Sequence, residues 1–138
     1  MPLTSALRHP VFVGGEKNYN GARAMPRTPA LRAMVETHLA AEAAALPRAL
    51  WLPLGPKPAA ALRHLAALGV LDETRILAGL PHPGGANTER IAYFLGRKGR
   101  GALSAMTRPE PLDAAREALR TQLSRLAAAP ARSGGSTA

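Results

Sequence analysis

The 138-residue sequence contains no cysteine, which excludes disulfides, zinc–thiolate sites, iron–sulfur clusters and thiol nucleophiles together. Its apolar runs are short, and charged or turn-forming residues end each one well before the roughly 18 residues that a membrane span needs. The start of the chain also lacks the charged-then-apolar layout of a secretory signal. These absences favour a cytoplasmic protein in a reducing compartment, with no membrane partner.

Aromatic and acidic residues are scarce as well. Five residues are aromatic and 29 are alanine, so each helix contact in the core buries little area. Nine acidic residues stand against 18 Lys and Arg, which gives a net charge of +9 and favours a polyanionic partner such as nucleic acid. The length fits one domain, which we expect over residues 1–128, followed by a disordered small-residue tail at 129–138.

Four stretches carry the spacing of apolar residues that predicts helices. They cover residues 29–46, 58–68, 88–95 and 111–128. Thr28 and Asn87 are suitable N-caps for the first and third helices, and Gly69 is a suitable left-handed cap after the second.

Two short runs between these helices are apolar on both sides, as buried parallel strands are. They lie at residues 49–52 and 76–80, and Val11–Val13 also has strand length. The resulting order of helix, strand, helix, strand, helix predicts an α/β fold with a small parallel sheet covered by helices. Ligands of such sheets bind beyond the carboxyl ends of the strands, where residues 53–56 and 81–87 lie.

The loop after the second predicted strand is the most informative segment. His82 lies between two prolines, which restrict the backbone and hold the imidazole in one orientation. Gly84 and Gly85 allow a ligand to approach the backbone closely, and Asn87 begins a helix whose amides attract anions. The segment predicts a site for an anionic or phosphate-bearing ligand. The alternative is a strained turn in which His82 caps a carbonyl group.

Two further loops offer contacts for nucleic acid. No acidic residue lies between Arg90 and Pro109, and glycines separate the cations of this loop, which are suited to phosphodiester contact; the alternative is a solvated basic loop. Residues 14–21 lack the pattern of a phosphate-binding P-loop. Their Asn18, Tyr19 and Asn20 can stack on or hydrogen-bond a base, and the alternative is a plain polar loop. The four histidines have no metal-ligand spacing, so no metal or cofactor is expected.

Three stretches resemble the C-terminal half of the uracil-DNA glycosylase superfamily. They are Thr4-Ser5 with the Leu7-Arg8-His9-Pro10 loop, the Leu52-Pro53-Leu54-Gly55-Pro56-Lys57 step, and Leu80-Pro81-His82-Pro83-Gly84-Gly85-Ala86-Asn87. The resemblance spans roughly residues 3–98. It implies a parallel α/β/α sandwich, here partial with its N-terminal part missing, and hydrolysis of the glycosidic bond of uracil in single- or double-stranded DNA.

Site roles follow from the resemblance residue by residue. His82 would hydrogen-bond the uracil carbonyl and stabilise the leaving base. Substrate binding would fall to Ser5, Pro83, Gly84, Gly85 and Asn87, and phosphate contact to Arg90, Arg97, Lys98 and Arg100. No cofactor is implied, and we expect a monomer.

The sequence also departs from the family pattern. Gly84 stands where the family has Ser, and Ser5 stands where an Asn commonly reads the base edge. The first family motif, a Gly-x-Asp/Glu-Pro loop that positions water, is absent and would lie before Met1. The chain is therefore expected to be a C-terminal portion or a truncated, inactive relative. The alternatives are a non-catalytic nucleic-acid-binding module and a protein that binds small anions.

Overall fold

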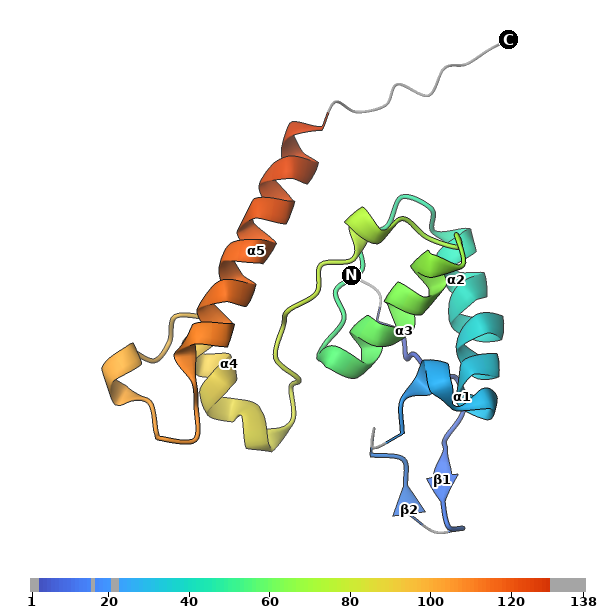
Figure 1. Ribbon diagram of the computed structural model, residues 1–138, viewed down its shortest axis with the longest axis horizontal. Coiled ribbons are helices and arrows are strands. Elements are labelled where there is room, and N and C mark those ends of the chain that lie inside the picture. The colour runs from blue at the N-terminus through green and yellow to red at the C-terminus, as the bar shows by residue number, and fades with distance from the viewer. Residues whose placement is uncertain (1–2, 16, 21–22, 130–138) are drawn as a thin grey trace.

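The computed structural model describes residues 3–15, 17–20 and 23–129, and it is mostly helical (Figure 1). The α-helices are α1 (Pro29–Met34), α2 (Ala40–Ala45), α3 (Pro56–Ala67), α4 (Thr88–Phe94) and α5 (Pro109–Ala128). Single 3-10 turns occur at Met25–Arg27, Glu73–Arg75, Gly85–Asn87 and Arg100–Ala102. The strands β1 (Phe12–Val13) and β2 (Lys17–Asn18) form an antiparallel pair. The predicted tail lies outside the described residues, apart from Ala129.

The first predicted helix is confirmed as one continuous helical stretch. A π-helical segment, Val35–Leu39, joins α1 to α2, and Thr28 precedes the first turn. The apolar stripe faces inward: Leu31, Val35, Leu39 and Ala43 are buried. Leu46 is 46% exposed because the helix ends at Ala45 and the backbone turns away there.

The core lies between this helical stretch and α3. Four residues of α3 are buried, Ala59, Ala61, Leu62 and Leu65, and the last three form one cluster with Met25, Leu31, Val35, Leu39 and Ile76. The helix ends as predicted, because Gly69 follows it with φ +77° and takes up the left-handed conformation that a side chain disfavours.

The predicted parallel sheet is wrong, and with it the α/β/α sandwich. Segments 49–52 and 76–80 are not strands; they meet in one parallel bridge, between Trp51 and Ile76. The Trp51 N–H donates to the Arg75 carbonyl, and the Leu77 N–H donates to the Trp51 carbonyl, both at 2.8 Å. Within the described ranges, the only sheet is the pair β1–β2.

Backbone chemistry explains why this ladder stops after one bridge. Pro53 is the next residue whose N–H would face the partner segment, and proline has no N–H to donate. On the partner segment, Gly79 has φ +112°, which is incompatible with a continuing strand. Helix α3 begins at Pro56, so the first segment has no length left to resume pairing.

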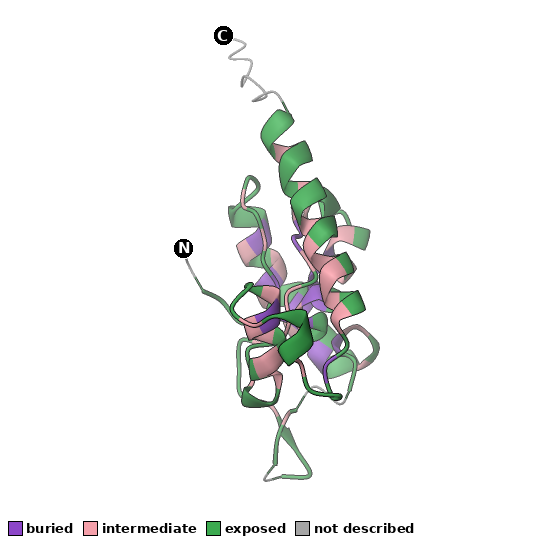
Figure 2. Ribbon diagram, turned by 90° about the vertical axis from the view of Figure 1, so that its left-hand side faces the viewer, coloured by how far each residue is buried: buried purple, intermediate pink, exposed green. Residues whose placement is uncertain are grey.

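Helix α5 packs on α4 and on the extended segment after Ile76. In Figure 1, α4 and α5 lie on one side of this segment and α1–α3 lie on the other. The Gln122 Nε2 donates to the carbonyls of Thr74 and Ile76, at 2.8 and 2.9 Å. No residue of α5 is buried, as the green and pink ribbon in Figure 2 shows. In the described part of the chain, no helix is long and apolar enough to cross a membrane.

Candidate functional site

The bridge between Trp51 and Ile76 brings two loops together. Because the paired segments run parallel, the residues that follow each of them leave in the same direction, and Gly55 comes to lie against His82. A β-carbon on Gly55 would be 3.0 Å from the His82 β-carbon. The backbone of Gly55 also has φ +111°, so glycine is needed for both space and conformation.

The His82 ring is exposed and held by one hydrogen bond. The Gly84 N–H donates to Nδ1 over 3.0 Å. An accepting Nδ1 has no proton in the neutral ring, so the proton is on Nε2. His82 donates to no carbonyl within the described residues, and the prediction of a histidine that caps a carbonyl finds no support there. The ring therefore offers Nε2–H as a hydrogen-bond donor.

The other residues predicted to bind substrate form no hydrogen bond to the His82 ring, apart from Gly84, within the described residues. The Ser5 hydroxyl accepts a hydrogen bond from the Leu7 N–H at 3.4 Å. Pro83 and Gly85 are exposed. The Asn87 side chain does not cap α4 but accepts from Arg90 at 3.0 Å. With seven residues, α4 is also a short helix to attract an anion to its N-terminal amides, as we expected from Asn87.

Four predicted phosphate contacts divide into two kinds. Lys98 is paired with Glu89 at 2.7 Å, and Arg100 is paired with Glu110 and Asp113 at 2.9 and 3.0 Å. Arg90 and Arg97 form no ion pair within the described ranges, although Arg90 contacts Asn87. Two of the four cations are therefore available for phosphate, and two already neutralise carboxylates.

Glu89 of α4 forms hydrogen bonds with several residues of the basic loop that follows this helix. Its carboxylate accepts from Lys98, from the backbone and hydroxyl of Ser104 at 3.1 and 2.6 Å, and from the Thr107 hydroxyl. These donors, led by Lys98, hold the pKa of Glu89 well below its usual range. A pocket of about 420 Å³ lies beside this carboxylate, lined by Gly85, Ala86, Thr88, Glu89, Arg90, Ser104, Met106 and Thr107. The bonds from Lys98, Ser104 and Thr107 to Glu89 hold this loop against α4.

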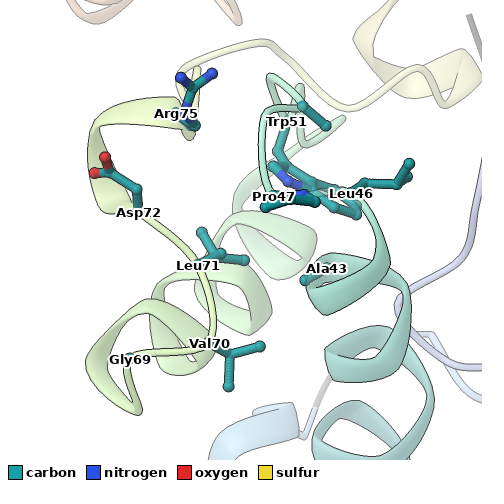
Figure 3. Close-up of a pocket in the computed structure, with 10 residues that line it drawn as sticks. Ala43, Leu46, Pro47, Trp51, Gly69, Val70, Leu71, Asp72 and Arg75 are labelled. Atoms are coloured by element: carbon teal, nitrogen blue, oxygen red, sulfur yellow. The ribbon is translucent and has the colours of Figure 1, made fainter. Parts of the chain in front are cut away.

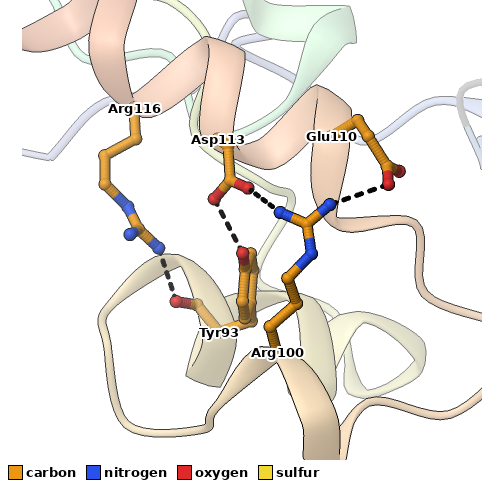
Figure 4. A network of polar contacts seen from close by, with 5 residues as sticks. All are labelled: Tyr93, Arg100, Glu110, Asp113 and Arg116. Carbon is orange, nitrogen blue, oxygen red and sulfur yellow. Dashed lines mark hydrogen bonds and ion pairs between the residues drawn. The ribbon is translucent and has the colours of Figure 1, made fainter.

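A second network joins α4 to α5 (Figure 4). The Tyr93 hydroxyl donates to Asp113 at 2.8 Å, and Arg116 donates to the Tyr93 carbonyl at 2.6 Å. The bond to Asp113 raises the pKa of the Tyr93 phenol. Arg100 reaches the other oxygen of Asp113, so the same carboxylate holds the loop and both helices. These contacts are structural.

A smaller hollow of about 170 Å³ lies between the loop after α2 and the loop after α3 (Figure 3). Its apolar wall includes Leu46, Trp51 and Leu71. The charged ends of Asp72 and Arg75 point away from this wall in Figure 3. His82 lines neither this hollow nor the pocket beside Glu89.

Comparison with known proteins finds a partial relative. The chain is 34% identical over 93 residues to "Uncharacterized protein YoxB" of Bacillus subtilis (strain 168). The aligned region is 66% of this chain and 36% of that protein, so the chain spans about a third of the length of the curated relative it matches. No family model and no solved structure matches the chain.

Proposed function

We propose that the chain is a uracil-DNA-glycosylase-like protein, which removes uracil from DNA by hydrolysis of the N-glycosidic bond. The observation that supports the proposal is the exposed His82 ring, which is held by the Gly84 N–H at Nδ1 and seated against Gly55, so that Nε2 is left to donate to a ligand. A base that leaves its sugar carries developing negative charge on a carbonyl oxygen. A positioned donor to such an oxygen contributes about 3 to 4 kcal/mol in enzymes where it has been measured.

The charge of the chain supports the choice of DNA as the partner. Extruding a base costs a few kcal/mol. Arg90 and Arg97 form no ion pair in the described part, so their contacts with phosphate can offset that cost. The substrate is uracil-containing DNA, single- or double-stranded, and the site of action is the cytoplasm. No cofactor takes part.

A non-catalytic nucleic-acid-binding module is the second candidate. It is favoured by the surroundings of His82, since no described carboxylate is hydrogen-bonded or ion-paired to this ring. Hydrolysis needs a group that activates water. The chain's own residues would then bind DNA and a base edge without breaking the glycosidic bond.

One experiment separates the two candidates. Wild type and His82→Ala are incubated with a labelled single strand that contains one uracil, and both base release and binding are measured. Release that His82→Ala abolishes, with binding retained, supports the glycosylase. Salt-dependent binding without release supports the binding module, and no binding to DNA contradicts both. His38→Ala is the matched histidine control, because His38 lies in the π-helical segment Val35–Leu39, where its ring packs against His9.

A further inference from the structure

The β1–β2 ribbon, residues 11–15 and 17–19, carries exposed apolar side chains near its tip. All four strand residues are exposed, and Phe12 and Val13 are 57% and 38% accessible. Successive residues of a strand point to opposite faces. Both faces of the ribbon are therefore bare, and Figures 1 and 2 show it projecting from the helical part of the molecule.

The base of the ribbon is anchored although its tip is not. Val11 and Tyr19 are half-buried against the core, and the Tyr19 N–H donates to the Val11 carbonyl at 2.8 Å. The Tyr19 hydroxyl donates to the Arg23 carbonyl, which fixes this half-buried side chain at the base of the ribbon. The exposed aromatic side chain of the ribbon is Phe12.

The charges of the sequence segment that contains Phe12 are mainly positive. Phe12 lies opposite Asn18, and Val13 lies opposite Lys17. Over residues 8–27 the sequence has Arg8, Lys17, Arg23 and Arg27 against the single acid Glu16. Arg8 is paired with Glu42, whereas Lys17, Arg23 and Arg27 form no ion pair in the described part of the chain. An isolated two-stranded ribbon is marginally stable in water, so a partner would stabilise this tip.

We propose that the ribbon is a nucleic-acid-binding element in which Phe12 stacks on an unpaired base on one face, beside Asn18, and Lys17, on the other face, contacts a phosphate of the same strand. Aromatic rings interleaved with cations are the combination that single-stranded nucleic acid selects. A second copy of the chain is a poorer partner, because both copies carry the same net charge of +9. The inference rests on the proposed nucleic-acid partner but not on base excision.

The test is binding of a fluorescent thymidine dodecamer, followed by anisotropy at several salt concentrations. Phe12→Ala should weaken binding about 5- to 150-fold, since stacking contributes about 1–3 kcal/mol per base. Phe12→Tyr should retain most of the affinity. Lys17→Gln should lower the salt slope by about 0.7, the value for one phosphate contact on a single strand. Leu68→Ala is the control, because Leu68 is 55% exposed but lies after α3.

Several outcomes would overturn the inference. Equal affinity of wild type and Phe12→Ala removes the stacking role. Stronger Phe12-dependent binding to phosphatidylserine vesicles than to the dodecamer assigns the ribbon to membranes instead. If the wild type binds the dodecamer in a Phe12-dependent way but releases no uracil, only the proposed glycosylase activity is contradicted. Unchanged binding by Phe12→Ala, with release intact, contradicts only the role of the ribbon.

Discussion

Gly55 and His82 are in direct contact, although 27 positions separate them in the sequence: a β-carbon on Gly55 would fall 3.0 Å from the His82 β-carbon. The contact depends on the single bridge between Trp51 and Ile76, which aligns the two segments. The position of the imidazole is therefore determined by a glycine in another loop.

Gly55→Ala should displace His82 and destabilise the protein. The substitution adds the close contact and also places an L side chain at φ +111°, a strain of about 1–3 kcal/mol. We expect the free energy of unfolding in urea to fall by that amount and any His82-dependent activity to fall with it. Gly101→Ala is the control, since nothing lies within 4 Å of its β-carbon position. Equal stability of the two variants would contradict the packing argument.

Arg97→Gln and Arg100→Gln should differ in their effects. Arg97 has no ion pair in the described residues, so its loss should weaken DNA binding and lower the salt slope by about 1. Arg100 already bridges Glu110 and Asp113, and its replacement should mainly lower the melting temperature. Anisotropy and thermal denaturation of both variants check the distinction, which fails if Arg100→Gln changes the salt slope as much as Arg97→Gln does.

Glu89 should make the stability depend on pH in the acid range. Its pKa is lower in the folded than in the unfolded chain, so the unfolded chain binds more protons there. The stabilisation is complete well above the ordinary glutamate pKa of about 4.3, and it is lost as the pH falls below that value. Glu89→Gln should flatten this dependence, measured by urea unfolding between about pH 3 and 6. Glu117→Gln, at an exposed pair with Arg120, should leave it unchanged.

Gln122→Ala should loosen α5. The variant loses two hydrogen bonds to the carbonyls of Thr74 and Ile76, worth roughly 1–3 kcal/mol together. Hydrogen exchange of the α5 amides should become faster, while exchange in α3 stays slow. The exposed substitution Ser124→Ala is the matched control. Unchanged hydrogen exchange in α5 would mean that its contacts with α4 are enough to hold the helix in place.

Helix positions could be predicted because they depend on local signals. Thr28 before Pro29, the spacing from Leu31 to Ala43 and the glycine at position 69 define ends and faces without reference to distant residues. The absence of strands at these positions could not be predicted, because a short apolar run such as 49–52 fits a buried strand and an extended connection equally well. Pro53 was the local signal against a continuing ladder.

The candidate site was predicted in part. His82 and its neighbouring glycine were evident from the sequence, but the Gly84–Nδ1 bond depends on the turn geometry. The internal pairing of Lys98 and Arg100 could not be foreseen, because their carboxylate partners lie 9 to 13 residues away along the chain. Gly55 carried one usable signal, since glycine is the residue that adopts positive φ most readily.

The interrupted pairing at Pro53 also has a consequence for solubility. In the described part of the chain, the backbone groups of Leu50 and Leu52 have no backbone partner, and both side chains are 44% exposed. Such an edge is prone to join the same edge of another molecule. The net charge of +9 keeps copies apart at low ionic strength. Added salt screens this repulsion, so concentrated solutions of the protein should aggregate as the ionic strength rises.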